Sequence, residues 1–262
     1  MKEIKAIEEF MQIIFELYRE TDDFNDKFSD WMIKDELIFR GQANKNYALV
    51  PSIGRNREDF TDFSILNKER ELIEMAKYKL PHIFKSNLNS IDLLSLLQHY
   101  GIPTRLLDVT LNPLVALFFS VLEYDEDGEV IVFQKNNIAE PNYLLNRAIA
   151  DSYKSINGTI CPLEWLYNNG ETYSSELIKK LIRETDENEK YIYEYCNNII
   201  LVRGAEWLER QKAQQGLYIL FHNDIVKVKD RTGFFFSKMI SPIEKESKYL
   251  NFPSKYFQTK PV

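Results

Sequence analysis

The chain has 262 residues, of which 44% are hydrophobic, and it carries a formal net charge of -7. This length and composition predict one compact domain with a sizeable core and room for an insertion. The acidic balance argues against a nonspecific binder of duplex nucleic acid, because such proteins need a basic face to displace counterions.

Residues that bind metals or form disulfides are sparse. Cys161, Cys196 and three histidines have no metal-ligand spacing, so no metal site is expected. The start of the chain is charged and amphipathic, without an apolar signal core, and no run approaches the roughly 18 apolar residues of a membrane span. We therefore expect a cytoplasmic protein in a reducing compartment, with no membrane partner.

The first predicted elements are an amphipathic helix and a short strand. Apolar side chains recur at helical spacing over about residues 4–19, which predicts a helix that packs on the core. Residues 36–42 predict a strand that ends in a glycine turn. Arg40 stands at the end of this strand, where a guanidinium can hold a phosphate or carboxylate bidentately. A lone arginine is, however, a surface residue more often than a ligand-binding one.

The stretch 91–122 predicts a buried helix, a short buried strand and a second buried helix. The first helix ends before Gly101, which can take the left-handed conformation, and Pro103, which cannot continue a helix. The second helix begins at Asn112 as N-cap, with Pro113 in its first turn. It is apolar nearly all round, so we expect it to lie in the core.

Polar side chains gather at the junctions of these elements. His99 and Tyr100 fall on the last turn of the first helix, and Arg105 and Asp108 put opposite charges into the predicted strand at about 104–108. Buried charges are rarely left unpaired, so we expect both to be largely buried and within reach of each other as an ion pair or through a shared ligand. Each residue alone could be purely structural, but together they indicate the wall of a cleft.

The second half of the chain predicts further strands around an insertion. A strand is expected over 129–133, residues 140–198 are polar and helical, and strands resume at 199–202 and 217–221. Gln214 and Gln215 precede the last of these strands, and amides at that entrance could reach a ligand.

These elements predict an α+β fold, with a mixed sheet of about five or six short strands flanked by helices and a helical insertion. A single domain is expected over 1–262. Its parts are a packing helix (about 4–19), a signature core (about 36–134), the insertion (about 140–198) and a closing sheet region with a tail (about 199–262). The GxxxxGK[ST], GxGxxG, GxSxG and HExxH motifs are all absent, which removes the familiar nucleotide and hydrolase signatures.

Three blocks of the sequence resemble the FRG domain family, a bacterial and phage-associated family named for its Phe-Arg-Gly signature. They are Phe39–Gln42, the run QHYGIPTRLLDVTLNPLVALFF at 98–119, and Gln214–Gly216 before an aromatic strand. The order and spacing of the blocks fit, and the resemblance extends over about 36–221. It implies an FRG-like domain over that range.

A weaker resemblance is to the ADP-ribosyltransferase fold. In those enzymes a strand-end arginine holds the dinucleotide, a Ser/Thr-containing turn leads into a buried helix, and a catalytic Glu stands at the entrance of a later strand. Arg40, Thr110 and the Gln214–Gln215 pair follow the same order. The resemblance implies NAD as a possible substrate. The candidate catalytic residues are His99, Asp108 and Gln214; the candidate ligand-binding residues are Arg40, Gly41, Gln42, Tyr100, Arg105, Thr110 and Gln215.

One departure from that pattern matters. The position of the catalytic Glu holds Gln214, Gln215 or Gly216, and a glutamine cannot act as a general base or stabilise an oxocarbenium ion by charge. Either Glu206, Glu209 or Asp108 replaces the missing acid, or the protein binds a nucleotide without turning it over.

Three functions remain open at this point. The first is an NAD-using ADP-ribosyltransferase or NAD hydrolase, acting as a bacterial toxin or anti-phage effector on a protein or nucleic-acid acceptor. In it Arg40 holds the phosphates, His99 or Tyr100 contacts the nicotinamide or ribose, and Asp108 or a nearby acid does the chemistry. The second is a non-catalytic module that binds a ligand or nucleic acid through Arg40, Arg105 and Gln214. The third is a scaffold whose polar residues form a buried network.

Overall fold

The computed structural model describes residues 2–27, 36–47, 49–54, 65–85, 87–122, 126–135, 144–151, 153, 200–204, 212–221 and 249–252. Within these residues the strands form one seven-stranded sheet in the order β1-β7-β4-β2-β3-β6-β5. The strands are β1 (Lys2–Glu3), β2 (Glu36–Gln42), β3 (Leu106–Thr110), β4 (Gly128–Lys135), β5 (Ile200–Val202), β6 (Gly216–Leu220) and β7 (Tyr249–Phe252).

The α+β class and the mixed sheet are confirmed, because β1 and β7 pair in parallel while the other neighbours are antiparallel. The sheet has more strands than expected. One additional strand is β1, which has only two residues. Two residues are too few to show an alternation of apolar and polar side chains, so the sequence could not predict this strand. Most of the closing region expected over about 199–262 lies outside the described residues.

The helices are α1 (Ile7–Lys27), η1 (Ser52–Gly54), α2 (Ile65–Lys79), α3 (Ser90–His99), α4 (Pro113–Ser120) and α5 (Leu144–Asp151). Helix α3 is mainly interior, as expected, and Gly101 follows it with a φ of 75°. Helix α5 falls in the anticipated insertion, of which residues 154–198 lie outside the description. Among the described helices, none has the length and apolar character needed to cross a membrane.

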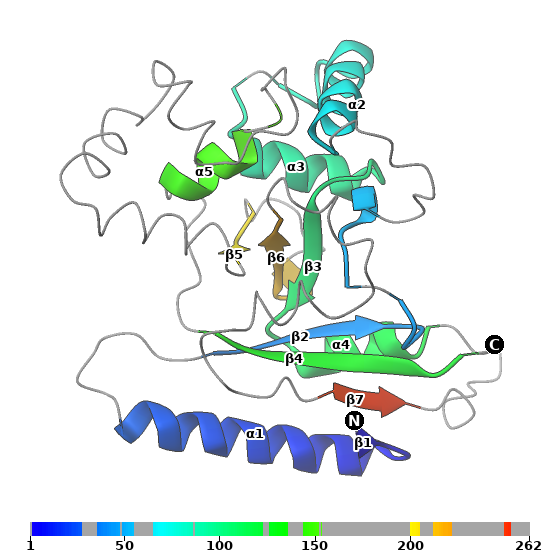
Figure 1. Cartoon of the computed structure of the whole chain (residues 1–262), viewed down its shortest axis with the longest axis vertical. Helices are drawn as coiled ribbons and strands as arrows, with labels where there is room; N and C mark the ends of the chain where they lie inside the picture. Colours follow the sequence, from blue (N-terminus) through cyan, green and yellow to red (C-terminus); the bar gives the residue numbers. More distant parts are fainter. Residues whose placement is uncertain are drawn as a thin grey trace.

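The sheet changes direction between β2 and β3. Strand β2 pairs with β4 over its whole length, from Glu36 to Gln42, but with β3 only through Phe39 and Thr110. In Figure 1, β2, β4 and β7 run across the lower part of the molecule, whereas β3 and β6 stand upright above them. The sheet therefore has two halves that meet at one residue pair.

Two separate helical layers cover one face of this sheet. Helices α1 and α4 pack on β2 and β4 around Leu37 and Phe39, and helices α3 and α5 pack on β3, β5 and β6 around Leu106 and Tyr218. The opposite face carries a third core that spans both halves. Since Phe39 and Thr110 are register partners and share a face, the two helical layers lie on the same face with a gap between them.

Helix α4 approaches the lower half-sheet through backbone rather than side chains. A Cβ added to Gly41 would lie 1.8 Å from the carbonyl oxygen of Ala116, and one added to Gly128 would lie 1.7 Å from that of Ser120. No side chain fits at either position, so the glycine of the Phe-Arg-Gly signature is required for helix-strand packing.

The expectation that the second apolar helix is fully buried is wrong for α4. Asn112 caps it as predicted, by accepting a hydrogen bond from the amide of Leu114. However, the side chains of Leu114 and Phe118 are 47% and 58% exposed. The helix buries only the face that meets the sheet, because nothing among the described residues covers its outer side.

Candidate functional site

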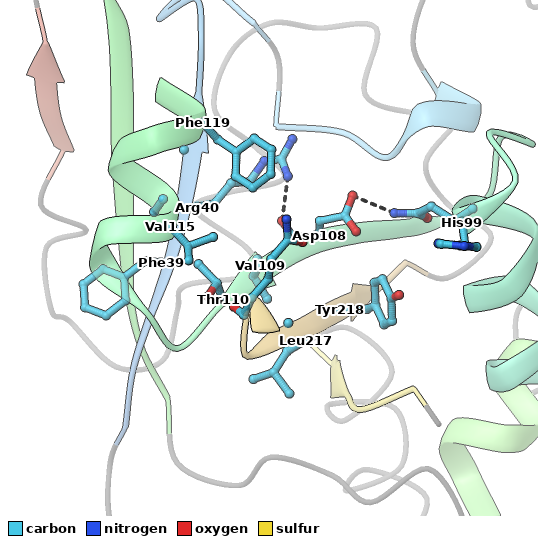
Figure 2. Close-up of a pocket in the computed structure, with 15 residues that line it drawn as sticks. Phe39, Arg40, His99, Asp108, Val109, Thr110, Val115, Phe119, Leu217 and Tyr218 are labelled. Atoms are coloured by element: carbon cyan, nitrogen blue, oxygen red, sulfur yellow. Dashed lines mark hydrogen bonds between the residues drawn. The ribbon is translucent and has the colours of Figure 1, made fainter. Parts of the chain in front are cut away.

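A cavity of about 280 Å³ lies on the helical face, between the two helical layers. We call it the first cavity. Figure 2 shows Asp108 between Arg40 and His99, with Phe119 beside Arg40 and Tyr218 rising from β6. Its wall is formed by Phe39, Arg40, Gly41, Gln98, His99, Asp108, Val109, Thr110, Val115, Ala116, Phe119, Gln214, Gly216, Leu217 and Tyr218. Blocks that are far apart in the sequence therefore meet here.

Arg40 lies where β2 and β3 separate. Its Nη1 donates a 2.6 Å hydrogen bond to the backbone carbonyl of Asp108, and its Nε donates to Oε1 of Gln42 at 3.4 Å. Beyond the Phe39–Thr110 pair, β2 offers β3 no further ladder partner, so this guanidinium replaces a strand-strand contact. Arg40 thus joins the two halves of the sheet and also brings a positive charge to the wall of the cavity.

A buried acid stands behind Arg40. Nε2 of Gln42 donates to Oε1 of Glu129 at 2.9 Å and to the carbonyl of Tyr47 at 3.2 Å, and both Gln42 and Glu129 are about 5% exposed or less. Burial raises the pKa of the Glu129 carboxyl, while the bond from Gln42 and the charge of Arg40 partly lower it. Gln42 therefore does not line the cavity, and instead links Arg40 to a carboxyl in the interior.

Asp108 is the carboxylate of the first cavity. It is exposed, and its Oδ2 accepts a 2.7 Å hydrogen bond from Nε2 of Gln98. Oε1 of Gln98 accepts from the hydroxyl of Thr104 at 2.6 Å, and that hydroxyl oxygen accepts from the amide of Leu106 at 3.2 Å. This chain of donors fixes the orientation of the Gln98 amide, so its NH₂ group faces Asp108.

The predicted pairing of Arg105 with Asp108 is wrong. Arg105 is fully buried and forms an ion pair with Glu69 of α2, with Nε 2.7 Å from Oε2, and its Nη1 donates to the carbonyl of Ile149 at 3.2 Å. Arg105 lies in the bend before β3 rather than in the strand, and its side chain extends to α2 and α5, away from the exposed Asp108. Arg105 is a structural link between α2, β3 and α5 and does not line the cavity.

Arg105 is surrounded by a buried polar cluster. Ser90 donates to Asp151, and Tyr153 lies nearby with 5% exposure. Burial, followed by the negative charges of Asp151 and Glu69, raises the pKa of Tyr153 to about 12. A tyrosine in this state stays protonated at neutral pH, and it serves packing rather than proton transfer.

Gln214 and Gln215, at the entrance of β6, differ in their position relative to the first cavity. Gln214 lines the first cavity, whereas Gln215 does not. The hydroxyl of Thr110 donates to the carbonyl of Gln214 at 2.6 Å and accepts from the amide of Asn112 at 3.0 Å. Thr110 therefore attaches the Gln214 turn to the start of α4, and its hydroxyl is occupied by these two bonds.

His99 and Tyr100, at the end of α3, differ in their position relative to the first cavity. His99 is exposed and lines the first cavity, while Tyr100 is half exposed and does not line it. The ring of Tyr100 packs edge-on against His99, with centroids 5.5 Å apart, and against Phe84 at 5.7 Å. Tyr100 thus supports the histidine ring from outside the cavity. The other candidate acids, Glu206 and Glu209, lie outside the described residues.

Sequence reasoning did not select several residues of this wall. Gln98 was read only as part of the central block, although it fixes the Asp108 carboxylate. Val115 and Phe119 were read as core residues, and Tyr218 only as part of the last predicted strand, yet they give the cavity its apolar and aromatic surface. The spacing of Val115 and Phe119, one helical turn apart, is the signal that a single face of α4 forms a wall.

Together, these observations define an α+β domain with a polar cleft whose described wall has one guanidinium, one carboxylate and an aromatic surface. Residues 35–129 match the family model of the FRG domain, so the chain contains an FRG domain. The match includes Arg40, His99 and Asp108, while the Gln214 turn lies beyond it. The searches of curated proteins and of solved structures found no match.

Proposed function

We propose that this FRG domain binds a nucleotide-type ligand in the first cavity, and that the ligand is NAD, whose nicotinamide-ribose bond is cleaved there. The observation that carries the proposal is the placement of a guanidinium and a carboxylate on one cavity, linked through the bond from Arg40 to the Asp108 backbone. At about 280 Å³, the cavity is just below the range of roughly 300–1,000 Å³ that is typical of small-molecule sites. It suits one half of a dinucleotide.

The charge pattern of the cavity complements the nicotinamide half of NAD. The nicotinamide ring is a cation, and a carboxylate such as Asp108 attracts it, while the neighbouring phosphate is an anion that a guanidinium holds well. Phe119 offers an aromatic surface on which the ring can stack. His99 and Gln214 provide polar contacts for the ribose hydroxyls.

The reaction would use Asp108 in place of the missing Glu. The bond between C1′ of the ribose and the nicotinamide nitrogen breaks, and both electrons leave with the nicotinamide, which becomes neutral. The oxocarbenium ion that remains is stabilised by the negative charge of Asp108. Water or a nucleophile of an acceptor molecule then adds to C1′ and loses a proton to solvent, Asp108 or His99.

A non-catalytic nucleotide-binding module is the second candidate function. It is favoured by the glutamine at position 214, where the resemblance to ADP-ribosyltransferases would require a Glu. In this case Arg40 and Asp108 provide recognition only, and NAD or another nucleotide binds without being consumed.

The two candidates are separated by binding and turnover measured on the same protein. Calorimetry with NAD and with NADH tests the charge argument, because NADH lacks the ring cation and should bind about tenfold more weakly, as expected when one charge-assisted contact is lost. Release of nicotinamide, followed by chromatography, tests catalysis. Asp108→Asn should abolish release with little change in thermal stability, since an asparagine oxygen can still accept from Gln98.

Asp127→Asn is the matched control, because Asp127 is bonded to Lys45 and lies outside the cavity. Binding without release of nicotinamide supports the module. If wild-type protein binds no NAD at millimolar concentration, the proposed function fails. Where NAD is consumed, a role as a bacterial toxin or anti-phage effector in the cytoplasm follows, and expression of wild type but not Asp108→Asn should arrest growth.

A further inference from the structure

A second cavity of about 420 Å³ adjoins the first cavity at the start of β6. It shares Gly216 and Leu217 with the first cavity, so the two cavities meet at the entrance of β6, beside the Gln214–Gly216 turn. Its described wall consists of Leu111, Arg203, Gly204, Lys212, Gln215, Gly216 and Leu217. The glutamine pair is thus shared, with Gln214 on the first cavity and Gln215 on the second.

The described wall of the second cavity is positively charged. It contains Arg203 and Lys212, and none of its described residues is acidic. This contrasts with the net charge of -7 of the whole chain. The charges of Arg203 and Lys212 can attract an anionic group to this surface.

The turn between the cavities has a constrained conformation. Gln215 has a φ of 46°, which non-glycine residues rarely adopt. It is held there by two backbone bonds: its amide donates to the carbonyl of Lys212 at 3.0 Å, and its carbonyl accepts from the amide of Leu111 at 3.2 Å. Such residues are often found at ligand-contacting turns. Here the constrained residue also fixes the backbone of Lys212 relative to both cavities.

We propose that the second cavity is the subsite for the distal, phosphate-bearing half of a dinucleotide whose nicotinamide half occupies the first cavity. This inference rests on the proposed function and adds to it a preference for dinucleotides over mononucleotides. Arg40 contacts the phosphate nearer the nicotinamide, and Arg203 and Lys212 contact the distal phosphate and ribose. Gln214 and Gln215 then contact the same ligand from the two sides of the turn.

Calorimetry with paired ligands and matched variants tests the subsite. Lys212→Ala should weaken NAD binding by about tenfold, as expected for the loss of one charge-assisted contact, and Arg203→Ala should do the same. Neither change should alter binding of nicotinamide mononucleotide, which lacks the distal half, by more than about twofold. Lys68→Ala is the control, because Lys68 is exposed on α2 and lines neither cavity.

The proposed subsite would be overturned if the variants weakened binding of NAD and of nicotinamide mononucleotide equally, or if they did not weaken binding of NAD. Lys212 is exposed, so its replacement keeps the test valid even if Arg203→Ala does not fold. A titration with inorganic pyrophosphate separates this inference from the proposed function. If NAD does not bind but pyrophosphate does, and Lys212→Ala removes that binding, the anion subsite stands and the NAD assignment fails. If neither ligand binds, both are rejected.

Discussion

Nη1 of Arg40 donates a 2.6 Å hydrogen bond to the backbone carbonyl of Asp108, so the cation of the cleft is attached to the residue that carries its anion. The two residues belong to different halves of the sheet, and the bond extends a contact that the ladder makes through a single pair. The signature arginine therefore has a structural role alongside any role in binding, and the two roles need separate measurements.

Arg40→Ala should reduce both stability and ligand affinity. Loss of the bonds to Asp108 and Gln42 should lower the free energy of unfolding by about 1–2 kcal/mol, and loss of the charge should weaken NAD binding by roughly ten- to a hundredfold. Arg40→Lys keeps the charge but cannot reach both acceptors in the same geometry, so it should recover part of the affinity and little of the stability. Urea unfolding measures the stability and calorimetry measures the affinity. If Arg40→Lys recovered stability and affinity equally, the separation of a structural role from a binding role would be contradicted.

Gly41→Ala should be strongly destabilising, by about 3 kcal/mol or more, because the new methyl group meets a helix backbone that cannot move aside. Gly101→Ala provides the matched control. A Cβ at Gly101 meets nothing within 4 Å, but its φ of 75° adds strain of about 1 kcal/mol. Unfolding of the two variants in urea should rank them in this order, and the reverse order would show that α4 does not lie against β2.

Arg105→Ala should lower the free energy of unfolding by about 3–5 kcal/mol, because it leaves the carboxylate of Glu69 buried without its partner. Arg70→Ala, at an exposed ion pair with Glu74, should cost less than about 1 kcal/mol. The double change of Glu69→Leu with Arg105→Met should be milder than Arg105→Ala, because it removes both buried charges. A double variant as unstable as the single one would argue against the ion pair as the cause.

Glu129 should make stability fall as pH rises. Its pKa is raised in the folded protein above the ordinary value of 4.5, so the folded state binds the proton more tightly than the unfolded state. The stability contribution is full below 4.5 and is lost as the pH rises through the raised pKa. Urea unfolding across this range should show the loss in wild type. Glu129→Gln should reduce it, whereas Glu126→Gln, at an exposed position, should not.

Gln98→Ala should impair the chemistry more than binding. The change removes the group that fixes the Asp108 carboxylate, so we expect the rate of nicotinamide release to fall by about tenfold, with a stability loss of about 1 kcal/mol. KM for NAD should change little, because Gln98 is bonded to Asp108 and not to Arg40, which is proposed to bind the phosphate. Gln12→Ala, on the exposed side of α1, is the control. A rise in KM with an unchanged rate would assign Gln98 to binding instead.

Local signals in the sequence predicted the elements well. The cap of α4 at Asn112 and the end of α3 before Gly101 were predicted correctly. Both features depend only on neighbouring backbone groups, so a short stretch of sequence is enough to predict them. The convergence of Arg40, His99 and Gln214 also follows the sequence, since all three lie in the blocks that resemble one family. The strand β1 was missed because two residues give no periodicity.

Partners distant in the sequence could not be predicted in the same way. Arg105 was expected to pair with the nearby Asp108, but its partner Glu69 lies on α2, 36 residues earlier in the chain. Gln42 was expected to face a ligand, yet Glu129 of the adjacent strand holds it inside. In both cases the partner residue comes close only in the folded chain. The spacing of residues in the sequence therefore cannot predict the contact.

The backbone contact of α4 with Gly41 and Gly128 also determines how this site can vary. Val115 and Phe119 stand on a helix whose backbone meets the strand bearing Arg40 directly at Gly41. Core residues beneath α1 can therefore be exchanged for others of similar volume without changing the distance between the aromatic wall and the arginine. Variation in ligand choice is then expected at Val115, Phe119 and the Gln214 turn, while the two glycines hold the width of the cleft constant.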